Sequence, residues 1–332
     1  MGTVLLAFGV SLGASAAFVR FPSLGRILTR ASAAPRWRMD AVPLGGGLAM
    51  GAGFGAAVAV FGRDLAGVGA ICGAAYLGLA VGLWDDLRPV RPAIKVAGQA
   101  ATGLALAALG VTLDLPGPEV VAWVATIVFV VAVTNAVNLL DNMDGVSGGV
   151  ALIAAVTLGI WWTVGTGPVA FAAALAGAVA GFLALNIHPA HLFMGDAGSH
   201  FLGAALAGLA ILDAGRAGTT GDASILAVLL GPVLLLAVPF FDMALVTVER
   251  IRHRRPVAEG GSDHTAHRLA RMGLGIRTVG FVLWAAAGVA AGVATLAGID
   301  GPWLAIGAAG FAVFGVVAWW RLAPYDPAVA TP

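Results

Sequence analysis

The chain alternates long apolar stretches with short polar connections, and this pattern predicts its fold class. Each stretch is about 17–20 residues long, and a helix of that length crosses the hydrocarbon core of a bilayer. We therefore predict an all-α polytopic membrane protein with about eleven transmembrane helices. The apolar stretches cover residues 3–19, 43–62, 66–84, 93–111, 119–138, 146–164, 168–186, 198–212, 224–247, 278–298 and 302–320.

The basic residues predict an orientation, because Lys and Arg accumulate in cytoplasmic loops. The odd-numbered loops and the C-terminus hold sixteen basic residues, whereas the even-numbered loops hold two, Arg63 and Arg216. The N-terminus is thus expected outside and the C-terminus in the cytoplasm. No Lys or Arg precedes the first apolar stretch, so it lacks the basic start of a signal peptide and is expected to be retained.

Composition supports one membrane-embedded unit. The 332 residues are 60% hydrophobic and 11% charged, whereas a soluble protein carries about 25% charged residues. A net charge of +1 provides no basic field for nucleic acid. We expect a single integral-membrane domain over residues 1–332, with a basic, histidine-containing cytoplasmic loop at 249–277.

Carboxylates gather at one predicted face of the membrane, although the rest of the chain is apolar. Asp85 and Asp86 end the third stretch, Asp141 and Asp144 follow the fifth, and Asp196 precedes the eighth. An Asp in the bilayer costs about 3 kcal/mol on insertion scales, so such a residue suggests a function. Carboxylates at one face indicate a divalent cation and a phosphorylated substrate.

Other polar side chains extend this predicted site. Lys95 is the one lysine of the chain, and its ammonium group can bind phosphate as a point charge. Asn135, Asn138 and Asp141 fall at i, i+3 and i+6, close to one helix face. Together with Asn186 they are predicted contacts for a nucleotide and a sugar.

The ninth stretch and the loop after it add further candidates. Asp242 is expected to face a polar cavity, with Arg250 as its partner. His264, His267 and Arg268 are expected to clamp a pyrophosphate from the loop side. Zinc is disfavoured there because no cysteine lies nearby.

These segments together resemble the polyprenyl-phosphate N-acetylhexosamine-1-phosphate transferase superfamily over about residues 40–270. Asn142 stands where glycine is common in that family, and Ala266 stands where another histidine is frequent. Both departures concern the identity of the sugar more than the reaction class. The matching motifs, in the order of the family, are Pro43-Leu44-Gly45-Gly46, Asp85-Asp86 with Lys95, Asn135-xx-Asn138-xx-Asp141-xx-Asp144-Gly145, Phe193-Met194-Gly195-Asp196-x-Gly198-Ser199 and His264-xx-His267-Arg268-Leu269.

The resemblance implies transfer of a sugar-1-phosphate from a UDP-N-acetylhexosamine to undecaprenyl phosphate, with release of UMP and the start of a lipid-linked cell-envelope glycan. It implies Mg²⁺, with Mn²⁺ as a substitute, held by Asp196. The site would lie on the cytoplasmic face of the inner (plasma) membrane, and a homodimer is a further hypothesis. The residues expected to be catalytic are Asp85, Asp86, Asp144, His264, His267 and Arg268.

Several alternatives stay open. The histidine loop resembles the GlcNAc-1-phosphate transferases more than the muramoyl-pentapeptide transferases, which typically carry three consecutive histidines. We favour direct displacement by the lipid phosphate over a covalent intermediate on Asp144. A cation- or proton-coupled transporter is the alternative of another class. A transporter predicts acidic residues near the middle of the membrane and an internal repeat, whereas the carboxylates of this chain gather at one predicted face.

Overall fold

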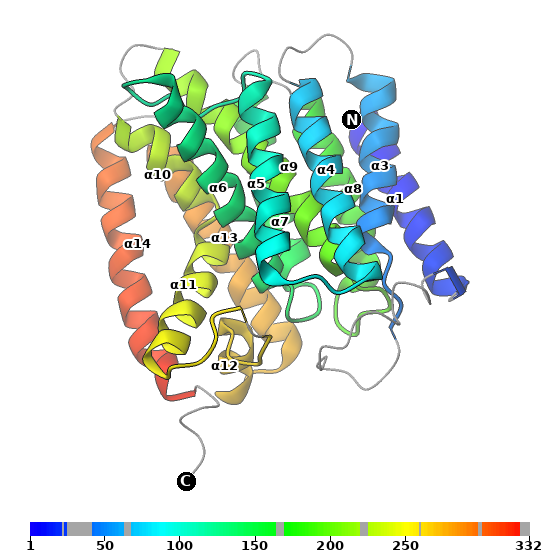
Figure 1. Ribbon diagram of the computed structural model, residues 1–332. Coiled ribbons are helices and arrows are strands. Elements are labelled where there is room, and N and C mark those ends of the chain that lie inside the picture. The colour runs from blue at the N-terminus through cyan, green and yellow to red at the C-terminus, as the bar shows by residue number, and fades with distance from the viewer. Residues whose placement is uncertain are drawn as a thin grey trace.

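The computed structural model is a bundle of helices that run alternately up and down (Figure 1). It describes residues 1–21, 23–24, 42–62, 68–163, 169–219, 225–258, 260–297 and 301–325. Within these ranges the β-structure consists of one isolated bridge, between Leu44 and Phe193. Five arginines used to predict the orientation lie outside the described residues: Arg26, Arg30, Arg36, Arg38 and Arg63.

Every predicted apolar stretch coincides with helical structure, so the all-α prediction is confirmed. The eighth stretch is longer than expected, because its helix begins at Gly195 and places Asp196 in the first turn. The helices are α1 (Gly2–Arg20), α3 (Gly46–Phe61), α4 (Val68–Leu87), α5 (Pro92–Ala108), α6 (Glu119–Leu140), α7 (Val146–Thr163), α8 (Val169–Asn186), α9 (Gly195–Thr219), α10 (Ile225–Leu235), α11 (Ala237–Arg252), α12 (Thr265–Arg271), α13 (Ile276–Ala297) and α14 (Gly301–Leu322).

The prediction of one continuous helix over residues 224–247 is wrong. The chain departs from helical geometry at Leu236, with φ −105° and ψ 27°, which separates α10 from α11. Pro239 has no N–H to donate to the carbonyl of residue 235, the last residue of α10, and its ring crowds that carbonyl. The break therefore falls one turn before the proline.

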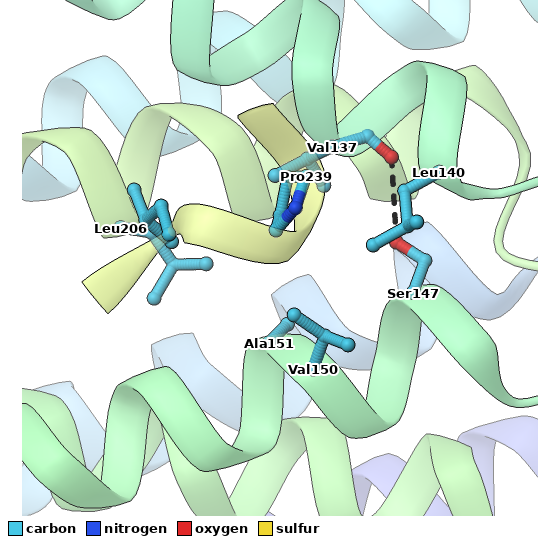
Figure 2. Close-up of a pocket in the computed structure, with 8 residues that line it drawn as sticks. Val137, Leu140, Ser147, Val150, Ala151, Leu206 and Pro239 are labelled. Atoms are coloured by element: carbon cyan, nitrogen blue, oxygen red, sulfur yellow. Dashed lines mark hydrogen bonds between the residues drawn. The ribbon is translucent and has the colours of Figure 1, made fainter. Parts of the chain in front are cut away.

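A small apolar pocket, too narrow to hold a water molecule, lies beside this break (Figure 2). Ser147 is its polar residue, and the Ser147 hydroxyl donates a hydrogen bond to the Val137 carbonyl at 3.3 Å. The cavity thus presents apolar groups and one hydroxyl that already has a partner. We interpret it as imperfect packing at the break rather than as a substrate site. Its lining consists of Val137, Leu140, Ser147, Val150, Ala151, Leu206, Leu236 and Pro239.

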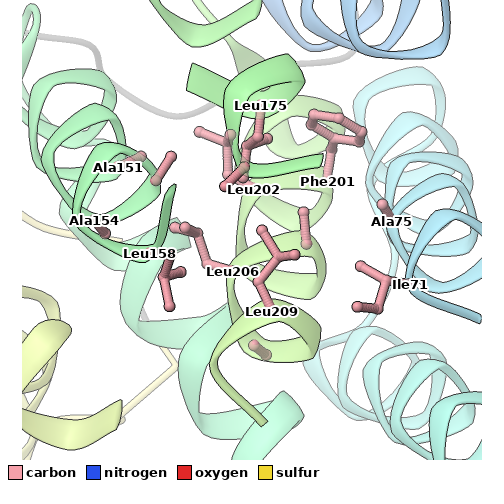
Figure 3. Packing of buried hydrophobic residues seen from close by; sticks show 14 of the residues in the cluster. Ile71, Ala75, Ala151, Ala154, Leu158, Leu175, Phe201, Leu202, Leu206 and Leu209 are labelled. Carbon is pink, nitrogen blue, oxygen red and sulfur yellow. The ribbon is translucent and has the colours of Figure 1, made fainter. Parts of the chain in front are cut away.

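Helix α9 forms the centre of the bundle. In an 18-residue part of its apolar segment Gly195–Ala214, 89% of the residues are buried, compared with 17% in the same length of α1. Figure 3 shows Phe201, Leu202 and Leu206 of α9 among side chains of α4, α7 and α8. Small residues permit this enclosure, because a Cβ atom at Gly203 would lie 2.5 Å from the Cα atom of Thr134 in α6.

Six of the described helices are long and apolar enough to cross a membrane: Gly2–Arg20, Gly69–Leu87, Glu119–Leu140, Val169–Asn186, Gly195–Ala214 and Ile276–Leu296. Shorter apolar helices cover Gly46–Phe61, Val146–Trp161 and Ala309–Leu322. The structure is thus that of a multi-helix membrane protein.

The connections that carry the candidate residues lie at one end of the bundle, the lower end in Figure 1. The loop at 249–277 contains the short helix α12, which the sequence analysis did not predict. Ala266 of α12 is fully buried and shares a hydrophobic cluster with Leu140, Met143 and Val279. This contact explains an apolar residue at position 266 and places α12 beside the segment that carries Asp141 and Asp144.

Candidate active site

Lys95 joins the first and third acidic segments. Its ammonium nitrogen lies 2.9 Å from Oδ2 of Asp85 and 2.6 Å from Oδ2 of Asp196. Asp85 lies in the last turn of α4, Lys95 in the first turn of α5, and Asp196 in the first turn of α9. The three side chains are 13%, 21% and 28% exposed, so one cation neutralises two carboxylates at a largely protected site.

Asn138 of α6 completes the surroundings of Asp196. Its amide nitrogen donates to Oδ1 of Asp196 at 2.8 Å and to the Ser199 hydroxyl at 2.8 Å. Both oxygens of Asp196 therefore have partners, one cationic and one neutral. Ser199 belongs to the predicted motif, but it had no assigned role, and the structure places it against this amide.

Asp86 holds the start of α9. Its two carboxylate oxygens accept hydrogen bonds from the backbone N–H groups of Asp196 at 3.0 Å and Ala197 at 2.9 Å. The first N–H groups of a helix lack partners within the helix, and a carboxylate there is favoured. Gly195 has φ +71°, and a Cβ atom on it would lie 2.6 Å from Asp86 Oδ2, so glycine is required.

The early glycine-rich motif supports the same turn. Phe193 N–H donates to the Pro43 carbonyl at 3.0 Å, and the Phe193 carbonyl accepts from Gly46 N–H at 3.0 Å. Gly47 N–H donates to the Met194 carbonyl at 3.0 Å. Residues 43–47 thus fix the chain just before Asp196, and they do so through backbone groups.

A hydrogen-bonded chain that sequence analysis missed extends from this cluster into the bundle. Gln99 exchanges hydrogen bonds with Asn135, at 2.7 Å and 3.3 Å, and lies 3.1 Å from Nε2 of His200. Nδ1 of His200 lies 2.9 Å from the Asp196 carbonyl. Gln99 and His200 come one helical turn after Lys95 and Asp196, and this i, i+4 spacing was the available signal.

Asp144 lies in a second cluster, formed by two loops. Its Oδ2 atom is 2.8 Å from Nδ1 of His188 and accepts a hydrogen bond from Ala190 N–H at 3.0 Å. The side chain of Asp144 is 4% exposed and that of His188 is 29% exposed. His188 is therefore the side-chain partner of a predicted catalytic carboxylate.

Asn186 ties these two loops together. Its amide oxygen accepts from Gly145 N–H at 3.0 Å, and its amide nitrogen donates to the Leu192 carbonyl at 2.8 Å. The side chain is buried. These bonds give Asn186 a structural role, whereas the sequence analysis predicts a substrate contact. Asp141, the residue after α6, is half-buried at the start of the same loop.

Asp242 holds the start of the histidine loop helix. Its Oδ2 atom lies 2.9 Å from Nδ1 of His264, and its Oδ1 atom accepts from Thr265 N–H at 2.6 Å. Asp242 is fully buried. A carboxylate on one ring nitrogen orients an imidazole and fixes its tautomer, which prepares the other nitrogen for a ligand.

The predicted pairing of Asp242 with Arg250 is wrong. Arg250 instead forms a bidentate pair with Asp263, with N–O distances of 2.8 and 2.9 Å. Arg255 adds a third contact to Asp263 at 3.2 Å. Burial acts to raise the pKa of Asp263, but the hydrogen bonds and charge of Arg250 outweigh it and lower that pKa to about 2. The pair anchors the residue next to His264.

The other two residues of the histidine loop are buried as well. Burial lowers the pKa of His267 to about 4, and the nearby charges of His264 and Arg271 act in the same direction. Arg268 is fully buried, and its guanidinium donates to the carbonyl of Asp263 at 2.7 Å. In this arrangement Arg268 contacts backbone carbonyls, whereas the sequence analysis predicts contact with a pyrophosphate.

The donor set fits a hard divalent cation only in part. Among the described residues, no group of three or more His, Cys, Asp and Glu side chains is gathered closely enough to hold a metal. Asp85 and Asp196 do approach one ammonium group from two sides. Mg²⁺ is often held by one or two carboxylates and completes its shell with water and substrate phosphate. Two carboxylates are compatible with that mode of binding.

The fold and the site define a class of protein: a multi-helix membrane protein with carboxylates, one lysine, amides and histidines gathered at one end of the bundle. Comparison with known proteins agrees with it. The model of glycosyl transferase family 4 matches residues 68–213, from α4 to α9.

Three relatives are similar to the chain over most of its length. A Streptomyces coelicolor protein named as a glycosyltransferase is 36% identical over 324 residues, which cover 94% of this chain and 74% of that protein. A decaprenyl-phosphate N-acetylglucosaminephosphotransferase of Mycolicibacterium smegmatis is 32% identical over 307 residues, covering 79% and 75%. A Bacillus subtilis protein named as an undecaprenyl-phosphate N-acetylglucosaminyl 1-phosphate transferase is 28% identical over 226 residues, covering 65% and 62%.

The chain belongs to glycosyl transferase family 4, within the superfamily of polyprenyl-phosphate sugar-1-phosphate transferases. Its matched part spans about three fifths to three quarters of the length of these relatives.

Proposed function

We propose that the protein transfers N-acetylhexosamine-1-phosphate, with GlcNAc-1-phosphate as the first choice, from a UDP-sugar to undecaprenyl phosphate. UMP leaves, and the lipid-linked product starts a cell-envelope glycan. The observation that carries the proposal is the contact of Lys95 with Asp85 and Asp196 at the end of the bundle. The relatives named as GlcNAc-1-phosphate transferases support the choice of sugar.

The proposal includes a membrane arrangement with eleven spans, the N-terminus outside and the C-terminus in the cytoplasm. The sixteen-to-two distribution of basic residues supports it. The candidate site then lies at the cytoplasmic face of the plasma membrane, where a soluble UDP-sugar and a lipid phosphate can meet.

Mg²⁺, or Mn²⁺ in its place, would be held by Asp196 and Asp85, with water and substrate oxygens completing the shell. When bound, it neutralises the pyrophosphate and stabilises the leaving phosphate. Lys95 offsets the charge of the incoming lipid phosphate. Asn138 orients Asp196, and Asp242 orients His264 toward the pyrophosphate of the donor.

In the reaction, an oxygen of the lipid phosphate attacks the phosphorus that carries the sugar. The bond from that phosphorus to the bridging oxygen breaks, and UMP leaves with that oxygen. A phosphate monoester has a second pKa of about 6, so the nucleophile is largely ionised at neutral pH without a base. The use of both Asp86 oxygens in holding α9 supports a positioning role for Asp86 over a base role.

The contacts of Asp144 favour this direct route over a covalent intermediate. One of its oxygens already has two partners, His188 and Ala190 N–H, and the side chain is buried. The test is exchange of labelled UMP into UDP-sugar without lipid acceptor. Direct displacement predicts no exchange, and robust exchange by lipid-free enzyme would rule it out.

The function is tested by mass spectrometry on the purified protein in detergent. The reaction contains undecaprenyl phosphate, Mg²⁺ and one donor at a time: UDP-GlcNAc, UDP-GalNAc or UDP-MurNAc-pentapeptide. We expect lipid-linked GlcNAc diphosphate and UMP, with loss of both on adding EDTA or in the Asp196→Ala variant. Product formed only with a different donor would keep the reaction class and change the sugar that we assign. If folded protein makes no product from any donor, the proposal is refuted.

A further inference from the structure

Helix α14 has an uneven surface. Along its middle, large apolar side chains are exposed, among them Val313 at 65% and Val316 at 63%. Near its C-terminal end, by contrast, Leu322 is buried, and Trp319 and two backbone carbonyls contact polar groups of the histidine loop and of α11. These contacts connect the C-terminal end of α14 to both of those segments.

The first contact runs through Arg268 of α12. Its Nη1 atom donates to the carbonyls of Leu322 at 3.3 Å and Ala323 at 3.4 Å, while Nε donates to the Asp263 carbonyl. The last carbonyls of a helix lack partners within the helix, and a cation there is favoured. A fully buried guanidinium thus connects the end of α14 to the residue that precedes His264.

The second contact runs through Trp319. Its indole N–H donates to Oε1 of Glu249 at 2.7 Å, and Glu249 is 2% exposed. The guanidinium of Arg252 lies 5.6 Å from the centre of the Trp319 ring and 3.3 Å from the same carboxylate oxygen. The end of α14 is therefore also fixed to α11, the helix that carries Asp242.

We infer that the C-terminal turn of α14 is a positioning element of the active site, in which Trp319, Glu249 and Arg268 set the place of His264. His264 is then held from two sides: directly by Asp242, and through its neighbour Asp263 by Arg268 and α14. None of the three positioning residues needs to touch substrate. The inference rests on the proposed function for its catalytic consequence, but not for the contact itself.

The test compares two neighbouring tryptophans. Trp319→Phe keeps most of the ring and removes the N–H group, while Trp320→Phe changes a side chain that is 72% exposed and serves as the matched control. We expect Trp319→Phe to lower kcat about tenfold or more, because small displacements of catalytic groups have such effects. KM for the lipid phosphate should stay near the wild-type value, and Trp320→Phe should behave as wild type.

Glu249 supplies a second pair of variants that does not depend on the tryptophan. Glu249→Gln keeps an acceptor for the indole N–H, and Glu249→Leu removes it. We expect Glu249→Gln to retain most of the activity and Glu249→Leu to lose activity as Trp319→Phe does. The Trp319→Phe/Glu249→Leu double variant should be no slower than the slower single variant, because each single variant already removes the hydrogen bond between Trp319 and Glu249.

Hydrogen–deuterium exchange of the peptide covering residues 260–272 separates this inference from the proposed function. We expect faster exchange there in Trp319→Phe and Glu249→Leu, whatever the activity of the wild type. Wild-type protein that makes no product from any donor would refute the function alone. Unchanged exchange and unchanged kcat in both variants would overturn the positioning role, as would an equal loss of activity in Trp320→Phe.

Discussion

Replacing Lys95 by methionine removes the cation between Asp85 and Asp196 while keeping most of the side-chain volume. Breaking a buried ion pair costs about 3–5 kcal/mol, because the partner charge stays behind. The three side chains keep 13–28% exposure, so solvent screening reduces the expected cost to about 2 kcal/mol. The two carboxylates then face each other with no cation between them.

A divalent cation should partly repair this defect. A ligand that binds only the folded state raises the free energy of unfolding by RT ln(1 + [L]/Kd). Without Lys95, the carboxylate pair should bind Mg²⁺ more tightly. We expect Lys95→Met to melt roughly 4 °C below wild type in EDTA, and to gain more from added Mg²⁺ than wild type does. Its transferase activity should fall about a hundredfold or more.

The assay is thermal unfolding of detergent-solubilised protein across a Mg²⁺ series, with product formation measured in parallel. Arg91→Met is the matched control, since Arg91 is an exposed basic residue one turn before Lys95. The reasoning is refuted if Lys95→Met melts with wild type in EDTA, or if Mg²⁺ stabilises both proteins equally. A shift of the same size in Arg91→Met would assign the effect to general surface charge.

Three further predictions concern the neighbouring contacts. Asp86→Asn should lower stability by about 1–2 kcal/mol in thermal unfolding, since one amide NH₂ would face a helix N–H, and should reduce activity by displacing Asp196. His188→Leu should reduce kcat about tenfold or more, and His188→Asn, which offers an N–H near the place of Nδ1, should recover much of it. His267 has a pKa lowered to about 4 in the folded state, so the unfolded chain binds more protons than the folded chain between pH 6.5 and 4. The contribution of His267 to stability is therefore present above pH 6.5 and is lost as the pH falls toward 4. His267→Gln should flatten that part of the curve of stability against pH.

Each of these has a result that contradicts it. Asp86→Asn with wild-type stability would show that the carboxylate does not hold α9. Equal losses in His188→Leu and His188→Asn would remove the orienting role of the hydrogen bond to Asp144. His191 is an exposed histidine and serves as the control. If the pH profile of stability is unchanged in His267→Gln but flattened in His191→Gln, His267 is not the group responsible.

The helices were predictable because a chain in lipid must satisfy its own backbone hydrogen bonds, so each long apolar stretch becomes a helix. The break at Leu236 was not predictable from the same rule, because transmembrane helices also tolerate proline without a break. The eleven residues from Asn186 to Asp196 were recognisable as a motif, but their folded path depends on the early segment at residues 43–47, which is distant in sequence.

For the site, residue type predicted which side chains gather, but not what each one does there. Nothing in the local sequence distinguishes Asp85, which pairs with Lys95, from Asp86, which holds a helix start. Likewise, Asp242 and Asp263 both lie within about a dozen residues of Arg250 in the sequence. In the structure the approach of α11 to the loop makes Asp263 the partner of Arg250 and leaves Asp242 to His264. Such choices depend on distances that only the assembled bundle sets.

The enclosure of α9 separates the candidate site residues at its start from changes in the thickness of the bilayer. When the hydrophobic thickness of a membrane changes, helices that face lipid respond by tilting or by local rearrangement. Nearly all of the apolar part of α9 is covered by protein, so such a strain falls on outer helices such as α1 before it reaches the helix that begins at Asp196. In the proposed function, the protein would meet a long, bulky lipid at its periphery while the residues at the start of α9 keep their positions.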